Sequence, residues 1–273
     1  KLLLEDFNEP NVASVMPIMK VHEPNNWLMR WQQLEYLTSI YLKMLMQERD
    51  CIPVTPGPFT TFRTKIIQEI GGYRKGHFTE DIELALRLQK NDYQLRQSFS
   101  STIRTKTPVN LKQYYNQRLR WYSGTFLNSL DYRHMMFRPQ YNDFGMIQLP
   151  MFLVAGFASM TAVMIVYGLQ FKQLWQQFDY WRLTGFDFLT YLKTWELSWN
   201  FLSTDFFVLT ISIMFISAAI YLIKHAYKAT KEPFTKKLIP STVGFMFFYS
   251  VLTAFIWFMA AIRMLLGKSG WTR

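Results

Sequence analysis

Cysteine is nearly absent from this sequence, and its scarcity limits the chemistry open to the chain. The 273 residues include one cysteine, Cys51. One thiol cannot form an internal disulfide and cannot build a metal cluster by itself. Free cysteine most often behaves as a small buried apolar residue. We therefore expect Cys51 to fill space in a core.

Charged residues are missing from three long runs in the carboxy-terminal half: Phe144 to Phe171, Phe206 to Ile223 and Leu238 to Ile262. A helix needs about 20 mostly apolar residues to cross the hydrocarbon core of a bilayer. Buried helices of a soluble protein are the alternative, but three such runs in one half favour membrane spans. We predict a transmembrane region over residues 145–262, with spans at about 147–169, 206–223 and 239–262.

The sequence also lacks an initiating methionine and a signal peptide of the charged-then-apolar type. Lys1 leads directly into Leu2, Leu3 and Leu4, as in the interior of a helix. We expect the sequence to be a fragment of a longer protein, with an upstream part missing.

Positive charge exceeds negative charge by 11 over the whole chain. Such an excess favours nucleic acid, anionic lipid or an acidic substrate as a partner. Nucleic acid is the weakest of the three, because the apolar runs have no place on a nucleic-acid-binding protein. Membrane lipid fits both the apolar runs and the basic charge.

The distribution of basic residues predicts an orientation. Five lysines follow the second run (Lys224, Lys228, Lys231, Lys236 and Lys237), which places that loop in the cytoplasm. The residues before the first run are then cytoplasmic too, in a multi-pass protein of the plasma or inner membrane. The aromatic-rich loop from Lys172 to Asp205 suits the outer interface. Arg263, Lys268 and Arg273 would end outside, against the rule.

Residues 1–130 have the patterns of a cytoplasmic α/β domain. Asn110 and Gln113 resemble a capping box, Thr79 stands where a helix N-cap is expected, and Gly71-Gly72 would end a helix. The predicted elements are a strand over Val12–Val21 that Pro17 makes irregular or places at a sheet edge, helices over Trp27–Gln47, Thr64–Ile70 and Thr79–Lys90, strands around Tyr93–Leu95 and Ser101–Thr105, and an interfacial helix over about residues 110–128.

Two acidic residues, Glu80 and Asp81, open one of these helices. Acidic side chains in the first turn interact favourably with the helix dipole, which explains them without any catalytic role. The functional interpretation places a carboxylate at the rim of a cleft, where it accepts a proton from an attacking sugar hydroxyl. Asp81 suits that role.

A second motif, Gln117-Arg118-Leu119-Arg120-Trp121, lies on the helix before the first apolar run. Gln117, Arg120 and Trp121 share one face by their spacing, with Arg118 turned away. A basic juxtamembrane helix whose tryptophan sits at the lipid headgroups is the structural alternative. In the functional interpretation the indole packs against a sugar ring and the cations neutralise a diphosphate leaving group.

The motifs together resemble the membrane-integrated family 2 glycosyltransferases, which include the synthases of cellulose, chitin, hyaluronan and poly-N-acetylglucosamine. The resemblance covers roughly Leu2 to Gly124 and the spans behind it. The motifs that carry it are Pro56-Gly57-Pro58, Phe62-Arg63, Gly71-Gly72-Tyr73, Thr79-Glu80-Asp81 and Gln117–Trp121. The Q-x-x-R-W pattern in the last of these is specific to the processive members.

The resemblance implies a fold and a set of site residues. The soluble half would be the C-terminal, acceptor-side part of a GT-A domain, followed by an α-helical transmembrane bundle. Asp81 would be the catalytic base, supported by Glu80, and Trp121 would stack on the acceptor sugar at the mouth of a channel. Substrate would be bound by Thr79, Gln117, Arg118 and Arg120, while Gly57, Pro58 and Arg63 would line the acceptor path.

The sequence departs from the family in one respect: it contains no D-x-D motif. The family places that motif, which binds Mg²⁺ or Mn²⁺, ahead of the segment that starts here. The metal ligands are therefore expected upstream of residue 1, and the fragment alone should be inactive.

The expected function is that of a processive inverting glycosyltransferase, which polymerises a β-linked polysaccharide from a UDP-sugar and exports it through its own spans. Inversion fits one base acting in an in-line attack. The UDP-sugar, the growing polysaccharide and an accessory export subunit would be its partners. The alternatives are a non-processive transferase acting on a lipid or short acceptor, and a non-catalytic membrane subunit.

Overall fold

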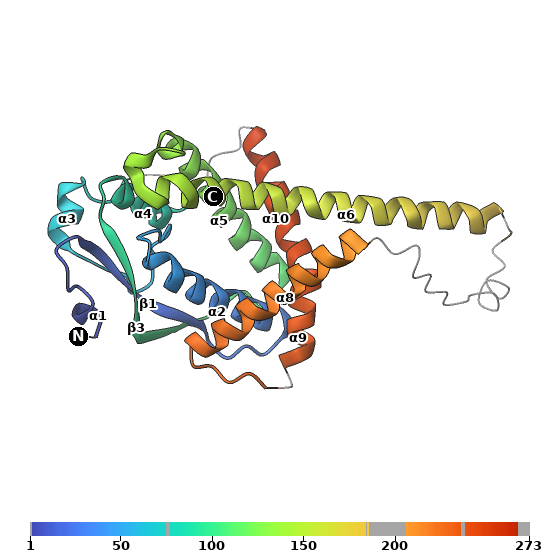
Figure 1. Cartoon of the computed structure of the whole chain (residues 1–273), viewed down its shortest axis with the longest axis horizontal. Coiled ribbons are helices and arrows are strands. Elements are labelled where there is room, and N and C mark those ends of the chain that lie inside the picture. The colour runs from blue at the N-terminus through green and yellow to red at the C-terminus, as the bar shows by residue number, and fades with distance from the viewer. Residues whose placement is uncertain (1, 75–76, 184, 186–205, 236–237, 267–273) are drawn as a thin grey trace. The chain divides into compact units, whose positions relative to one another are not determined.

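The computed structural model describes residues 2–74, 77–183, 185, 206–235 and 238–266 (Figure 1). The chain divides into two compact units. One consists of Lys1–Met160 with Leu222–Arg273, and the other is Thr161–Tyr221. The predicted combination of an α/β part with long apolar helices is confirmed.

A three-stranded sheet lies at the centre of the α/β part. Strand β1 (Val12–Val21) pairs antiparallel with β2 (Thr61–Phe62) and parallel with β3 (Gln94–Thr105). Eight of the ten residues of β1 are buried, as expected for a central strand covered on both faces. Of the two effects expected of Pro17, the irregularity is confirmed, since the register with β3 shifts between Pro17 and Ile18. The edge position is wrong, because β1 is the central strand of the sheet.

The prediction of two short strands near Tyr93–Leu95 and Ser101–Thr105 was wrong, because β3 is one strand. Pro17 is opposite Ser98, and the next residue, Ile18, is opposite Thr102. The intervening residues of β3 therefore form an irregularity within the strand rather than a break. The long partner strand β1 pairs on both sides of this irregularity and keeps β3 continuous.

Helices cover the sheet and form two apolar cores with it. The long helix α2 (Trp27–Gln47) begins at Asn26, whose side chain accepts a hydrogen bond from the backbone N–H of Met29 at 2.8 Å. Helices α3 (Thr64–Glu69) and α4 (Glu80–Lys90) follow, after the short amino-terminal helix α1 (Leu2–Glu5). The core beneath α4 comprises Ala13, Met16, Ile52, Ile66, Leu84, Ala85, Leu88 and Leu95. The core beneath α2 includes Ile18, Leu34, Leu37 and Ile40.

Helix α5 (Leu111–Asp131) connects this core to the apolar helices. Its predicted cap is confirmed, because Asn110 accepts a hydrogen bond from the N–H of Gln113 at 2.9 Å. The helix continues to Asp131, beyond the predicted end near residue 128. Two short 3₁₀ helices, η1 (Arg133–Met135) and η2 (Pro139–Tyr141), precede the π-helical turn η3 (Phe144–Gln148).

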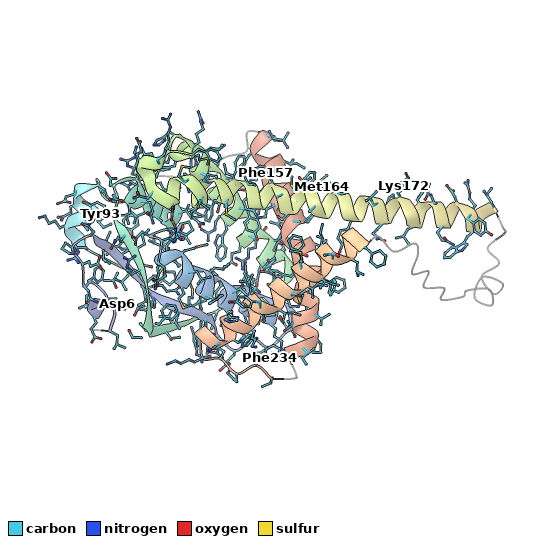
Figure 2. The ribbon with its side chains drawn as sticks, viewed as in Figure 1. Asp6, Tyr93, Phe157, Met164, Lys172 and Phe234 are labelled. Atoms are coloured by element: carbon cyan, nitrogen blue, oxygen red, sulfur yellow. The ribbon has the colours of Figure 1, made fainter. Side chains whose placement is uncertain are left out.

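Within the part of the chain that the structure describes, three helices are long and apolar enough to cross a membrane, as predicted: Phe144–Leu183, Leu209–Ala229 and Ile239–Leu265. They comprise η3 with α6 (Leu149–Leu183), then α8 (Phe206–Ala229), and finally α9 (Ile239–Gly244), the π turn η6 (Phe245–Tyr249) and α10 (Ser250–Leu265). Met164 is one of the exposed apolar side chains of α6, and Lys172 lies farther along the same helix (Figure 2).

The first apolar helix is longer than predicted. It runs to Leu183, whereas the sequence placed a loop from Lys172 onward. Asp179 and Arg182 pair at 3.4 Å across one turn, and this contact supports the added length. Residues 186–205 of the predicted outer loop, and Lys236, Lys237, Lys268 and Arg273, lie outside the described residues.

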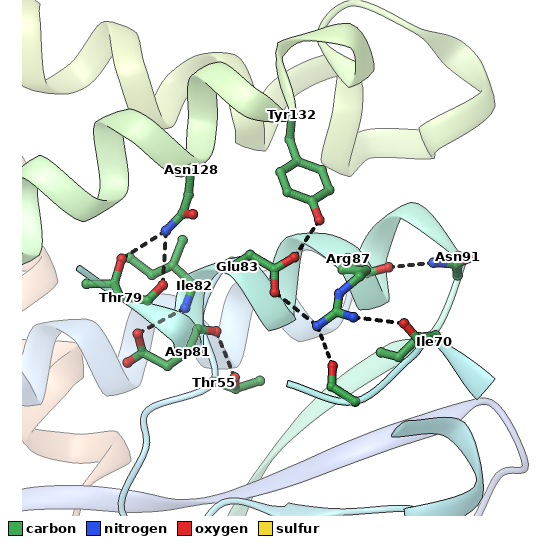
Figure 3. Close-up of polar contacts among 11 residues, drawn as sticks. Thr55, Ile70, Thr79, Asp81, Ile82, Glu83, Arg87, Asn91, Asn128 and Tyr132 are labelled. Carbon is green, nitrogen blue, oxygen red and sulfur yellow. Dashed lines mark hydrogen bonds and ion pairs between the residues drawn. The ribbon is translucent and has the colours of Figure 1, made fainter. Parts of the chain in front are cut away.

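A buried ion pair fixes the turn that leads into α4 (Figure 3). The guanidinium of Arg87 donates to Glu83 Oε2 at 3.0 Å, to the carbonyl oxygen of Ile70 at 2.8 Å and to that of Gly72 at 2.7 Å. Tyr132 donates its hydroxyl to the other carboxylate oxygen of Glu83 at 2.8 Å. Arg87 thus holds the Gly71-Gly72 turn, whose two glycines have positive φ, against α4.

Replacing Arg87 by methionine should lower the free energy of unfolding by about 3–5 kcal/mol, because Glu83 is left buried without its cation. The measurement is the denaturant midpoint of the purified protein in detergent. Lys90→Met, which removes an exposed cation from the same helix, is the matched control. Equal shifts for the two variants would show that the ion pair has no special structural role.

Candidate functional site

The structure brings the segment His77–Thr79 onto one face of α5, so the two predicted motifs meet there. Arg120 Nη1 donates to the carbonyl oxygen of Phe78 at 3.3 Å. One turn farther along, Gly124 faces the side chain of Thr79. The acidic pair that follows Thr79 is therefore anchored to the helix that carries Gln117–Trp121.

Asp81 is half-buried in the first turn of α4. Its Oδ1 accepts a hydrogen bond from the N–H of Ile82 at 3.0 Å, and Thr55 donates its hydroxyl to the Asp81 carbonyl oxygen at 2.9 Å. Burial raises the pKa of the Asp81 carboxyl, and the negative charge of Glu80 raises it further. The Ile82 hydrogen bond and the charge of Arg120 oppose this rise. A carboxylate with a raised pKa takes up a proton more readily.

Two further ionisable side chains lie near Asp81, Lys43 and Tyr73, and neither was predicted as a site residue. Burial lowers the pKa of Lys43 on α2 to about 8, while the charge of Asp81 acts in the opposite direction. Burial also raises the pKa of Tyr73, and Glu80 and Asp81 add to the rise. Lys43 and Tyr73 therefore share the electrostatic environment of the carboxylate pair. Gly71-Gly72-Tyr73 was already a recognised motif, but no local pattern identified Lys43.

Thr79 occupies the N-cap position of α4, but its side chain does not cap the helix. Its hydroxyl instead accepts a hydrogen bond from the amide of Asn128 on α5 at 2.9 Å. Thr79 is 3% exposed, so its contacts are with protein. Direct binding of substrate by Thr79 stays a prediction.

Arg118 is buried beneath Trp121 rather than turned away from it. The side chain is 1% exposed, and its guanidinium lies 4.1 Å from the centre of the Trp121 ring. Arg118 also donates a hydrogen bond to Glu35 of α2. The Glu35 carboxylate accepts a second bond from the Tyr249 hydroxyl at 2.6 Å. Arg118 thus supports the indole from behind, and its predicted contact with substrate remains untested.

The other residues of this motif are more accessible than Arg118. Gln117, Arg120 and Trp121 are each partly exposed, as a ligand-contacting face requires. The side-chain oxygen of Gln117 is an exception, since it is buried and accepts no hydrogen bond from the described residues.

The predicted acceptor loop joins the core to β2. Gly57 and Pro58 are exposed, and a side chain at Gly57 would meet open space. Arg63 instead points to the amino-terminal segment, where it donates to the carbonyl oxygens of Val12 at 3.2 Å and Glu9 at 3.1 Å. These bonds attach the carboxy-terminal end of the loop to the amino-terminal segment. The place of the loop on an acceptor path stays a prediction.

A cavity of about 300 Å³ lies beside the contact between His77–Thr79 and α5, and none of the predicted site residues lines it. Its lining includes His77, Glu83, Asn128 and Tyr132. His77 Nε2 lies 2.8 Å from Asp131 Oδ2. The described part of the chain has no group of three His, Cys, Asp or Glu residues able to hold a metal ion.

Comparison with known proteins gives a family match. The protein-family model described as "Glycosyl transferase family group 2" matches residues 1–267. Over 124 residues the chain is 24% identical to a poly-beta-1,6-N-acetyl-D-glucosamine synthase of Staphylococcus epidermidis, covering 45% of this chain and 30% of that protein. Over 127 residues it is 26% identical to the chitin synthase chs-1 of Caenorhabditis elegans, covering 41% and 10%. The chain thus spans less than a third of either relative.

Replacing Asp81 by asparagine should raise the unfolding temperature at pH 7 by a few degrees. The folded state raises the pKa of Asp81, so wild-type stability falls as the pH rises from the ordinary aspartate pKa, about 3.9, through the higher folded value. Asparagine avoids the cost of the buried charge. Below about pH 3.9 the carboxyl is protonated in both states, and the advantage should vanish.

The measurement is thermal unfolding in detergent across this pH range. Glu48→Gln, which neutralises an exposed carboxylate at the end of α2, is the control and should change little. A lower unfolding temperature for Asp81→Asn at pH 7 would mean that the folded protein stabilises the ionised carboxylate.

Proposed function

The chain belongs to glycosyl transferase family group 2, and from this premise we propose that it carries the acceptor side of a processive, inverting polysaccharide synthase. The observation that carries the proposal is the packing of His77–Thr79 on α5. It brings the segment before Asp81 onto the same helix as Trp121, ahead of three helices able to cross a membrane. A base and a flat apolar surface so placed suit transfer to a sugar hydroxyl.

In the proposed reaction, Asp81 accepts the proton of the acceptor hydroxyl while that oxygen bonds to the anomeric carbon of the donor. The bond from this carbon to the diphosphate breaks on the opposite face, and its electron pair leaves with UDP. The configuration at the anomeric carbon is thereby inverted. Glu80 keeps Asp81 basic through its negative charge. Trp121, supported from behind by Arg118, would hold the acceptor ring.

The donor and the polymer are also proposed. Poly-beta-1,6-N-acetyl-D-glucosamine synthase is the name of one relative, so UDP-N-acetylglucosamine is the first donor to test. Arg120 and Gln117 would contact the donor diphosphate or the acceptor. Mg²⁺ or Mn²⁺ would neutralise the diphosphate, held by residues other than those described here.

The helices long enough to cross a membrane are the observation that supports the proposed export of the product. We place residues 1–130 in the cytoplasm and residues 145–262 in the plasma or inner membrane, with the polymer passing through the spans. An accessory export subunit and surrounding lipid would be further partners. A non-processive transferase remains a second candidate, since the same base would serve a lipid or short acceptor.

Loss of the base should abolish transfer. In membranes containing the complete protein, labelled UDP-sugars and Mg²⁺ or Mn²⁺, Asp81→Asn should lower incorporation by about 10²–10⁴-fold, the usual contribution of a general base. Trp121→Ala should shorten the product, because the acceptor is held less tightly. Trp27→Ala, at an indole that is 50% exposed on α2, is the matched control and should leave both readouts unchanged.

Each outcome distinguishes the candidates. Long polymer made from one donor supports the synthase. Short products alone favour the non-processive transferase. A folded, inserted protein that incorporates no sugar from any donor favours a non-catalytic subunit.

The pH dependence of transfer should respond to Glu80. Because Asp81 must be ionised to act as a base, activity should fall on the acid side as its carboxyl becomes protonated. The charge of Glu80 raises the pKa of Asp81, so Glu80→Gln should move this acid limb to lower pH. Rates measured from pH 4 to 8 at saturating donor test this. A limb moved to higher pH would contradict the proposed relation between the two carboxyls.

A further inference from the structure

The side chain of Asn128 makes two hydrogen bonds to one residue far away in the sequence (Figure 3). Its Nδ2 donates to the carbonyl oxygen of Thr79 at 3.0 Å and to the Thr79 hydroxyl at 2.9 Å. Asn128 is completely buried, so water does not compete for these bonds. Thr79 immediately precedes the helix that begins with Glu80 and Asp81.

The backbone of α5 approaches Thr79 closely enough to exclude a side chain at Gly124. A Cβ atom there would overlap the Thr79 side chain. Gly124 and Asn128 are four residues apart and so lie on the same face of α5. The contact with Gly124 and the hydrogen bonds from Asn128 together fix the position and the orientation of Thr79.

Two further contacts secure the same segment at its other residues. Arg120 donates to the Phe78 carbonyl oxygen, and Asp131 pairs with His77 at 2.8 Å. Together with Gly124 and Asn128, these residues follow one face of α5 at spacings of four, four and three. The segment before Asp81 is therefore aligned along the helix over almost three turns.

Thr79 uses its hydroxyl to bind Asn128, whereas a threonine at a helix start usually uses its hydroxyl to cap the helix. An N-cap hydroxyl normally accepts a hydrogen bond from a backbone N–H of the first turn, which stabilises the helix. The hydroxyl of Thr79 makes no such bond. It is engaged with Asn128, so the residue serves the docking of α4 on α5 rather than the stability of α4 alone.

We propose that Asn128 is a positioning residue, which holds Asp81 at a fixed distance and angle from Trp121 through Thr79. The proposal rests on the proposed function of Asp81 as the base. Asn128 lies two turns beyond Trp121 on the same helix, so α5 sets the spacing between the base and the acceptor surface. Misplacement of a reacting group by about 1 Å can lower a rate about 10²-fold.

A purely structural role for Asn128 predicts a different result. A buried amide that only satisfies a backbone carbonyl would affect stability and yield, while the folded enzyme would keep its turnover. A positioning role lowers turnover per folded molecule and leaves donor binding intact, because Asn128 acts on Asp81 through Thr79.

The test is Asn128→Asp, which keeps the shape of the side chain but replaces its two N–H donors by an acceptor oxygen. In membranes containing the complete protein, kcat should fall about 10²-fold while KM for the UDP-sugar stays within about twofold. Asn116→Asp, on the exposed face of the same helix, is the matched control and should behave as wild type. Folding of each variant is followed by detergent-solubilised yield and unfolding temperature.

A second measurement covers the case in which Asn128→Asp does not accumulate. Asn128→Ser keeps one donor, and Thr79→Val removes the hydroxyl acceptor while keeping the shape of its side chain. The kcat effects of these two changes should be non-additive in the double variant, because both disrupt the same contact. Additive effects would overturn the proposal.

The remaining outcomes separate this proposal from the proposed function. Active wild type, inactive Asp81→Asn and a folded Asn128→Asp with wild-type kcat would overturn the positioning role alone. Wild-type protein that transfers no sugar would overturn both.

Discussion

An ion pair between the buried Arg118 and the partly exposed Glu35 joins the helices around the candidate site, and the geometry of that site depends on it. Arg118 belongs to α5 and Glu35 to α2, and the same carboxylate accepts a bond from Tyr249 next to α10. Because α2 also packs on the sheet, the indole of Trp121 is supported by the core of the α/β part. Arginine keeps its charge across the physiological pH range, so the cation of this pair is always present.

The apolar helices are packed directly on the helix that carries the site. Tyr122 of α5 stacks on Trp257 of α10, with ring centres 4.7 Å apart and planes 12° from parallel. Gly156 of α6 faces the indole of Trp257, since a side chain at this position would press on that ring. A displacement of α10 therefore acts on α5 both at Tyr122 and through the Tyr249–Glu35 bond. The candidate site and the apolar helices therefore share these contacts.

Local patterns in the sequence predicted most of the helices, the cap at Asn110 and the three apolar spans, because these depend on residues close together in the chain. The continuity of β3 was missed, since it depends on pairing with β1 some 80 residues away. The burial of Arg118 and the engagement of Thr79 by Asn128 were missed for the same reason. Residue types at a helix start predict a cap, but only the packing of α5 shows that the hydroxyl is used elsewhere.

Cys51 lies behind α4, where it packs with Ile82 and Leu86 and is 5% exposed. Burial, with Asp143 and Asp50 nearby, raises the pKa of its thiol to about 11, so little reactive thiolate forms at neutral pH. The chain is consequently suited to spectroscopic labelling without removal of its native cysteine. A cysteine introduced at an exposed position of α5, paired with another at the carboxy-terminal end of α10, would carry spin or fluorescent probes selectively. Distances between such probes would report directly on movement between the site helix and the apolar helices during turnover.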